Sequence, residues 1–324
     1  VCSSDLQALH ELRANKLRTF LSLLGITIGI FCIVSVRTVL DSLKNNIQKD
    51  MATLGSNVLY VGRWPWMDDG TEYKWWEYWR RPGMTPAEVR AIETNVPDAA
   101  AVTLCLTTRR LTLKHQDMEL SSIAGYAVLN YFDKVQNIDI QLGRYLSSSE
   151  LDGGNNAVVL GYTVFSNLFP GNVDPLGKSV TFLGRKFTIV GVMKKAGQNM
   201  AGFDYDNSVV FPYNAATSLL DVKALSYDPV LAVLAAKGKD PDEVKYEVEG
   251  VLRRMRKVRP GQPNDFAINQ LSQVSERLNA VFVGIDMAGL AISMLSLLVG
   301  AFGIANIMFV TVKERTRIIG LKKA

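Results

Sequence analysis

The stretch that decides the fold lies at the end of the chain: "GAFGIANIMFVTVKERTRIIGLKKA", residues 300–324 of 324. It passes without a break from uncharged residues into a segment with five Lys or Arg residues and a single Glu. The uncharged part belongs to a run of 26 residues, Met287–Val312, and a second run of 18 residues, Thr19–Val36, lies near the other end. As helices these runs are roughly 39 and 27 Å long, against about 30 Å of hydrocarbon in a bilayer. We therefore predict two transmembrane helices, 19–41 and 287–312, rather than two buried core helices.

Composition and charge orient these two helices. Hydrophobic residues make up 48% of the chain and the mean hydropathy is +0.09, which is high for a soluble protein of this size. Residues 1–19 hold three basic and two acidic residues and residues 313–324 hold five and one, so the net charge of +5 is carried by the two ends. Because short basic flanks stay in the cytoplasm, both termini should lie inside. We predict a multi-pass protein of the cell inner membrane with a large periplasmic domain and no nucleic-acid partner.

The first uncharged run is better explained as a permanent span than as a removable signal peptide. It exceeds the usual apolar core of about 7–15 residues, and no small-residue cleavage site follows it. The three cysteines support no disulfide framework, because Cys32 lies in this run, Cys2 lies at the terminus and Cys105 is alone in the outer segment.

Apolar residues keep a helical period next to both predicted spans, in residues 42–56 and 271–286. The two stripes are Leu43, Ile47 and Met51 on one side, and Leu271, Val274 and Leu278 on the other. Two such stripes can pair as a short stalk that carries movement between the membrane and the outer domain. The alternative is that both helices pack separately on the outer domain.

The outer segment, 57–270, has the pattern of a mixed α/β domain, so the fold class is an α+β membrane protein with two spans and a helical stalk. Strand patterns are present in "NVLYVG", "NAVVLG", "SVVFP" and "DFAINQL". Two strand pairs are predicted, one across Gln116–Asp117 and one turning at Gly184. We expect an α/β subdomain formed by 57–125 and 225–270, and a β-rich insertion at 126–220.

Two helices are predicted in the α/β subdomain. The first follows a capping box, with Thr85 as the cap and Glu88 three residues later. The second spans 240–258 and has one apolar face. That face consists of Val244, Val248, Val251, Leu252 and Met255.

No catalytic or metal-binding pattern is evident in the sequence. The two histidines, His10 and His115, are far apart, and no paired-carboxylate, Cys/His or zinc-type spacing occurs. The segment "GNVDPLGKS", 171–179, has Asn172 where a phosphate-binding loop needs Gly, and a strand pattern follows it. We interpret it as a turn, and expect neither an ATPase site nor a cofactor on this chain.

All five tryptophans lie within sixteen residues. They are Trp64, Trp66, Trp75, Trp76 and Trp79. Clustered indoles can form a small local core, contact a partner or ligand, or lie among lipid headgroups. The sequence does not distinguish these three interpretations.

The chain ends resemble a known family. "LLVGAFGIANIMFVTVKERTRIIGLKKA" resembles the end of the second span and the following cytoplasmic helix of the MacB-type permeases of ABC transporters, which are related to FtsX and to the lipoprotein-releasing LolC/LolE permeases. "ELRANKLRTFLSLLGITIGI" resembles the entry helix and first span of the same family. Between them, "LGSNVLYV", "GRYLSSSE", "NLFPGNVDPLGKSVTFLGRKFTIVGVM" and "VVFP" resemble the periplasmic domain in the same order, so that the resemblance covers residues 8–324.

The resemblance implies a subunit with four spans, so we expect this chain to stop before the third. The tail, 313–324, would be a coupling helix that docks on an ABC ATPase subunit, with the entry helix, 7–18, nearby. ATP and magnesium would then bind to the partner ATPase. The positions implied for that contact are Glu314, Arg315, Arg317 and Gly320 in the tail, and Arg13, Lys16 and Arg18 in the entry helix. The tail departs from the family at Ile318, where Glu is usual.

The function that the resemblance implies is mechanical. Closure of two ATPases would move the stalks and outer domains of two permease copies, either identical or different. Periplasmic substrates such as drugs or peptides would then leave through an adaptor and an outer-membrane channel. A lipoprotein-releasing or FtsX-like regulatory permease is the alternative within the family. A two-span sensor receptor is the alternative from another class, but it should continue into a heptad signalling helix, which "KERTRIIGLKKA" does not resemble.

Overall fold

The computed structural model divides the chain into two compact units, Val1–Asn46 with Glu276–Ala324, and Ile47–Ser275. We describe each unit separately. The described residues are 24, 27, 30–31, 33–46, 57–67, 75–171, 173–196, 204–222, 224 and 227–323.

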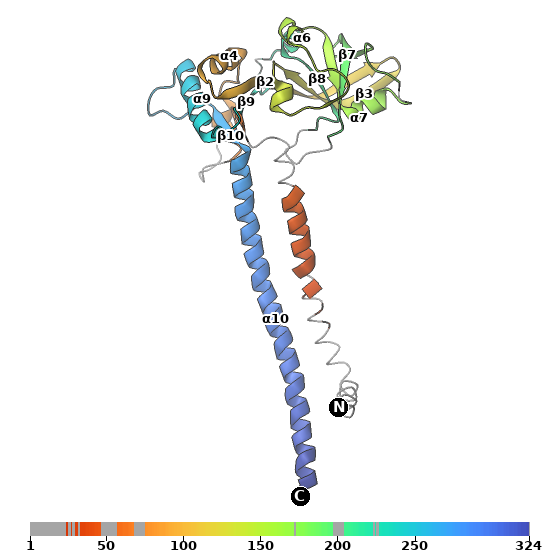
Figure 1. Cartoon of the computed structure of the whole chain (residues 1–324), viewed down its shortest axis with the longest axis vertical. Helices are drawn as coiled ribbons and strands as arrows, with labels where there is room; N and C mark the ends of the chain where they lie inside the picture. Colours follow the sequence, from red (N-terminus) through yellow and green to blue (C-terminus); the bar gives the residue numbers. More distant parts are fainter. Residues whose placement is uncertain are drawn as a thin grey trace. The chain divides into compact units, whose positions relative to one another are not determined.

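The first unit contains most of α10, Leu271–Lys323, a helix of 53 residues (blue in Figure 1). It includes the whole uncharged run 287–312 and most of the basic tail. Many large apolar side chains on it are exposed, among them Met287 (69%), Phe302 (72%) and Phe309 (74%). The described residues of 33–46 are also helical. Among the residues described, no helix combines the length and the apolar character needed to cross a membrane.

The second unit is built on one sheet, in which the described residues form ten strands. Six of its elements follow the order β-α-β-β-α-β, and their four strands are arranged β10-β1-β9-β2 with antiparallel neighbours. This is the arrangement of a ferredoxin-like fold. The six elements are β1 (Val58–Gly62), α4 (Pro86–Asn95), β2 (Ala99–His115), β9 (Val230–Ala235), α9 (Pro241–Met255) and β10 (Ala267–Gln270).

Local sequence explains both helices of this half. Helix α4 begins with the predicted capping box, in which Glu88 accepts hydrogen bonds from the Thr85 backbone N–H at 2.7 Å and its hydroxyl at 2.9 Å. Helix α9 buries four of the five residues predicted for its apolar face. The fifth, Met255, is 41% exposed. Met255 is the last residue of α9.

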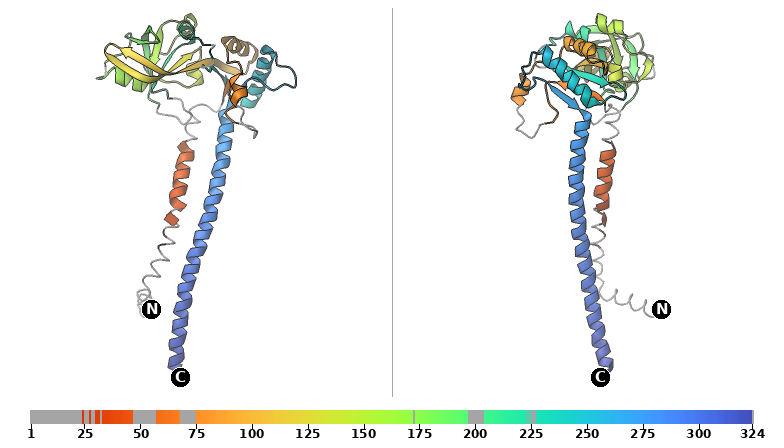
Figure 2. Two further views of the ribbon diagram at one scale, coloured as in Figure 1. Left: turned by 180° about the vertical axis from the view of Figure 1, so that it is seen from behind. Right: turned by 60° about the vertical axis from the view of Figure 1, so that its left-hand side comes forward.

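The remaining strands form an insertion between β2 and β9. Strand β2 pairs with β3 (Met118–Val128) as a long antiparallel ribbon, which Figure 2 shows from two sides. The sheet then continues from β3 in the order β8-β5-β7-β4, and β6 pairs with both β2 and β7. These strands are β4 (Ile140–Gly143), β5 (Ala157–Leu160), β6 (Ser179–Phe182), β7 (Arg185–Met193) and β8 (Ser208–Pro212). The short helices of this unit are α3 (Trp75–Trp79), α5 (Phe132–Val135), α6 (Ser148–Gly153), α7 (Tyr162–Leu168) and α8 (Tyr213–Thr217).

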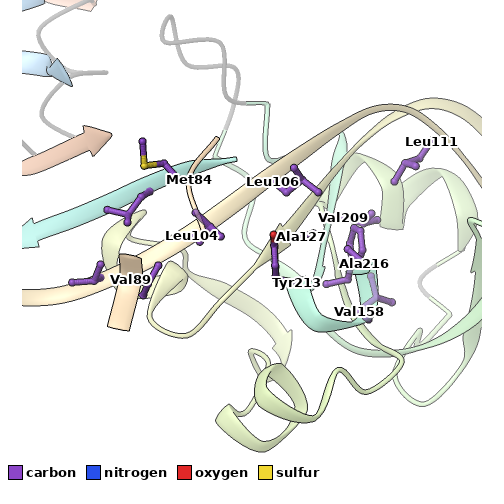
Figure 3. Close-up of a cluster of buried hydrophobic side chains, with 14 of the residues drawn as sticks. Met84, Val89, Leu104, Leu106, Leu111, Ala127, Val158, Val209, Tyr213 and Ala216 are labelled. Carbon is purple, nitrogen blue, oxygen red and sulfur yellow. The ribbon is translucent and has the colours of Figure 1, made fainter. Parts of the chain in front are cut away.

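One apolar core runs through both halves of the sheet. Along β2, Val102, Leu104 and Leu106 are buried on the same face, as the two-residue period of a strand requires. Leu104 lies near Val89 of α4, whereas Leu106 lies toward Val209 of β8 (Figure 3). Because β2 belongs to both halves, it carries the core from one to the other.

The predicted strands and strand pairs are present at the expected places. The turn predicted at Gly184 joins β6 to β7, and both Leu183 (φ 50°) and Gly184 (φ 74°) have positive φ. This is the geometry of the two-residue turns that suit a twisted hairpin. The subdomain limits of 125 and 225 stay a prediction, since the described sheet is continuous across them.

Candidate functional site

The predicted ATPase-coupling residues remain untested by the geometry. Glu314, Arg315, Arg317 and Gly320 lie within α10, but only its backbone is described there. The entry-helix residues Arg13, Lys16 and Arg18 lie outside the described residues. Their role in binding an ATPase stays a prediction.

The predicted stalk is described in part. Ile47 and Met51 lie outside the described residues, and Leu43 is 39% exposed on a helix. Leu271 is buried with Tyr60 and other side chains of the sheet, so it packs in the outer domain itself. Val274 and Leu278 follow on α10 and are half-buried. Pairing of the two stripes stays a prediction.

The tryptophans are not equivalent in their surroundings. Trp64 is half-buried, and its ring lies 6.2 Å from those of both Tyr78 and Trp79 in edge-on contacts. The other four are exposed, by 43% for Trp66, 58% for Trp75, 46% for Trp76 and 44% for Trp79. A small local core therefore accounts for the position of Trp64. The four exposed indoles leave room for a partner, ligand or lipid contact.

A buried amide fixes the loop that carries the first two tryptophans. Asn269 of β10 accepts a hydrogen bond from the Trp66 backbone N–H at 2.8 Å and donates to the Trp64 carbonyl at 3.0 Å. Just before them, the buried Arg63 forms an ion pair with Asp228 at 2.9 Å. Burial raises the pKa of Asp228, and the Arg63 charge opposes that shift. These two hydrogen bonds and the ion pair therefore fix residues 63–66, which follow β1.

This loop forms one wall of a pocket with a volume of about 350 Å³. Trp66 and Tyr78 line one side, and the strand β10 lines another with all four of its residues. Lys245 of α9 and the first turn of α10, through Gln273 and Val274, complete it. The volume lies within the range of small-ligand sites, roughly 300–1,000 Å³.

The pocket is basic in its lining. Its side chains include Arg81 and Lys245 but no Asp or Glu. Burial lowers the pKa of the Arg81 guanidinium, which stacks 4.5 Å from the Tyr78 ring and donates to the Arg63 carbonyl at 3.2 Å. Two cations without a lining carboxylate favour an anionic ligand. Sequence reasoning missed this site, since its residues come from five separate segments; only the tryptophan run pointed toward it.

A second polar cluster lies inside the domain, where the two halves meet. Gln136, which follows α5, accepts a hydrogen bond from Tyr205 at 3.0 Å and donates to Tyr60 of β1 at 3.3 Å. Burial raises the pKa of both tyrosines, that of Tyr60 to about 12. Both hydroxyls therefore stay protonated and can donate. The glutamine links a residue of the ferredoxin-like half to one of the insertion.

Outside these clusters, the described part of the chain contains the free cysteine Cys105 and the histidine His115. No group of three or more His, Cys, Asp or Glu side chains in them could hold a metal ion. Burial raises the pKa of the free Cys105 thiol to about 12, so it is not a thiolate at neutral pH. His115 donates from Nδ1 to the Ser179 carbonyl at 2.8 Å and lies against Phe169. The predicted turn before β6 is present: Gly177 has a φ of 73°, and a strand follows at Ser179.

Known proteins resemble this chain in sequence. Pyoverdine export ATP-binding/permease protein PvdT of Pseudomonas savastanoi pv. phaseolicola is 28% identical over 312 residues, which are 96% of this chain and 44% of that protein. Macrolide export ATP-binding/permease protein MacB of Rhodospirillum rubrum is 27% identical over 321 residues, 97% of this chain and 46% of that protein. The chain thus spans less than half the length of these relatives.

Solved structures resemble it in fold. The crystal structure of the periplasmic region of MacB from Actinobacillus actinomycetemcomitans has a TM-score of 0.57 at 16% identity and covers 72% of this chain and 97% of that one. The extracellular domain of the noncanonic ABC-type transporter YknZ from Gram-positive bacteria has a TM-score of 0.50 at 16% identity and covers 66% of this chain and 100% of that one.

A family model decides the assignment. The model of the MacB-like periplasmic core domain matches residues 19–251, which is well over half of the chain. The matched region includes β1, α4, the whole insertion and most of α9. The chain belongs to the MacB-type family of ABC transporter permeases.

Proposed function

We propose that this chain is the part of an ABC exporter permease that transmits ATP-driven motion across the inner membrane to its periplasmic domain. Family membership supports this proposal, because the relatives are named export ATP-binding/permease proteins. In the proposal, residues 19–41 and 287–312 are the two spans, and residues 57–270 form the periplasmic domain.

The observation that carries the proposal is the continuity of α10. This single helix begins at Leu271, directly after the last strand of the sheet, and contains both the uncharged run and the tail. At 1.5 Å per residue it is roughly 80 Å long. The large apolar side chains exposed between Met287 and Val312 suit a lipid or helix environment better than water. Such a helix can connect an event at the tail to the outer domain.

The proposed partners follow from this arrangement. An ABC ATPase would bind the tail at Glu314, Arg315, Arg317 and Gly320, with the entry helix beside it, and would hold ATP and magnesium. A second permease copy would provide the opposing stalk and outer domain. A periplasmic adaptor and an outer-membrane channel would take over substrates that the outer domains release, such as drugs or peptides.

The test is a charge reversal in the tail of the complete permease, expressed with its ATPase. We expect Arg315→Glu with Arg317→Glu to abolish copurification of the ATPase, because two attractive contacts become repulsive. The outer domain should keep its wild-type unfolding midpoint. A matched control carries Lys186→Glu with Lys237→Glu, two exposed lysines of the outer domain. Unchanged ATPase binding by the tail variant, or equal loss in the control, would contradict the coupling role.

A further inference from the structure

The sheet of the outer domain has an open edge. Strand β10 pairs with β1, and no other strand of the described chain lies on its far side. In a four-residue strand, alternate backbone N–H and C=O groups point away from the paired neighbour. Among the described residues, only β1 and the first turn of α10 hydrogen bond with the backbone of Ala267–Gln270. These groups are a template for one more strand.

The pocket follows this edge, and its walls differ on the two faces of the sheet. Leu59 and Val61 of β1 face the core that α9 covers, and Lys245 of α9 lies at the pocket on that side. Tyr60 points to the opposite face, where the Trp66 ring lies against it, tilted by 34° with 5.2 Å between the ring centroids. An extended segment along β10 would therefore direct alternate side chains toward a cation and toward an aromatic wall.

The charge of the pocket favours acidic side chains at the positions that point toward Lys245. No carboxylate lines the pocket, and Lys245 has no ion pair with any described residue. The first turn of α10, which also lines the pocket, adds the positive end of a helix dipole. A Glu or Asp side chain would satisfy this lysine.

The amides of the pocket argue against a carbohydrate, although tryptophan and amide side chains often bind sugars. Asn269 is occupied by the loop of Trp64 and Trp66. Gln270 donates to Asp242 at 3.1 Å and accepts from Gln273 at 3.0 Å. The β10 backbone and the Lys245 ammonium stay open to a ligand.

We propose that this groove binds an extended acidic segment of a partner protein by strand addition to β10, with alternating carboxylate and apolar side chains. The four residues of β10 can pair with about 13 Å of such a segment. Main-chain hydrogen bonds hold the segment, and Lys245 and Trp66 select its side chains. The binding is independent of ATP.

The probe is a fluorescein-labelled hexapeptide, Val-Glu-Val-Glu-Val-Glu, added to the whole chain in detergent micelles. We expect saturable binding by fluorescence anisotropy and slower hydrogen exchange of residues 267–270. Two further peptides carry N-methyl groups on the backbone nitrogens, one at its three glutamates and the other at its three valines. Because alternate N–H groups of the added strand face β10, at least one of these two peptides should fail to bind. A Val-Lys hexapeptide should bind at least tenfold more weakly.

Two variants locate the contact. Lys245→Glu should weaken peptide binding at least tenfold, whereas Lys237→Glu, an exposed lysine that does not line the pocket, should change it less than twofold. Absence of binding at 1 mM of the unmethylated peptide, or binding of both methylated peptides as strong as that of the unmethylated one, would overturn strand addition. Binding of chitotetraose without binding of the peptide would overturn it in favour of a glycan site.

Discussion

The ion pair between Glu88 and Arg256 should be a main support of the ferredoxin-like half. The Arg256 Nε lies 2.7 Å from Glu88 Oε1, and the side chains are only 8% and 6% exposed. Glu88 belongs to the first turn of α4, and Arg256 caps the end of α9. The pair therefore ties together two helices that pack on the same face of the sheet (Figure 1).

Glu88→Ala removes two contributions at once. Loss of the capping box costs about 1 kcal/mol. Leaving a buried charge without its partner costs about 3–5 kcal/mol. Asp265 remains 3.4 Å from the Arg256 guanidinium and offsets part of the second cost. We expect the free energy of unfolding to fall by roughly 3–4 kcal/mol, out of a typical total of about 5–15 kcal/mol.

Urea denaturation followed by tryptophan fluorescence measures this change, because Trp64 follows β1 in the ferredoxin-like half, to which α4 also belongs. Arg256→Met should cost less, because Glu88 keeps its two hydrogen bonds from Thr85. The double variant, Glu88→Ala with Arg256→Met, should lose about 1–3 kcal/mol less free energy of unfolding than the two single variants lose together. Glu93→Ala, on an exposed position of α4, is the control and should stay within about 0.5 kcal/mol. A loss below about 1 kcal/mol for Glu88→Ala, with additive effects of the two single substitutions, would show that the ion pair contributes little to stability.

Three further predictions concern other parts of the chain. Both terminal nitrogens of Arg144 hydrogen bond with Glu150 at 2.7 Å, which lowers the Glu150 pKa from 4.5 to about 2. Glu150 therefore stabilises the fold above pH 4.5, and the stability gap between wild type and Glu150→Gln should close as pH falls toward 2; a constant gap would exclude this linkage. Gln136→Leu removes one hydrogen-bond partner from each of two buried tyrosine hydroxyls and should lower the free energy of unfolding in urea by about 1–3 kcal/mol, whereas an unchanged midpoint would mean that these two hydrogen bonds contribute little. If the stalk stripes pair, cysteines at Ile47 and Val274 or one turn away should form a crosslink, and failure along both stripes would show that they pack elsewhere.

The local structure of the outer domain could be predicted from the sequence, because it depends on residues that are neighbours in the chain. The Thr85 capping box, the turn at Gly184 and the apolar face of α9 each depend on contacts within a few residues. The pairing of β1 with β9 and β10 depends on residues about 170–210 positions apart, and no period in the sequence specifies it. The ferredoxin-like order was therefore not predicted.

The candidate site could likewise be predicted only in part, because most of its residues are far apart in the sequence. The tryptophan run marked one wall of the pocket, because unusual composition is visible without a structure. Lys245 and Asn269 look like ordinary helix-surface and strand residues, and only the fold brings them to the edge of β10. Gln136 is similar, since its two tyrosine partners lie 76 and 69 residues away.

In the proposed function, α10 links the outer domain to a tail on the other side of the membrane. Single cysteines at Asp117 and at Lys322, in a chain whose native cysteines are replaced, test it with a membrane-impermeant maleimide. Asp117 lies exposed at the β2–β3 turn. In intact spheroplasts, we expect labelling at position 117 and none at 322 until the membrane is permeabilised. Labelling at 322 in intact spheroplasts, or protection at 117, would contradict it.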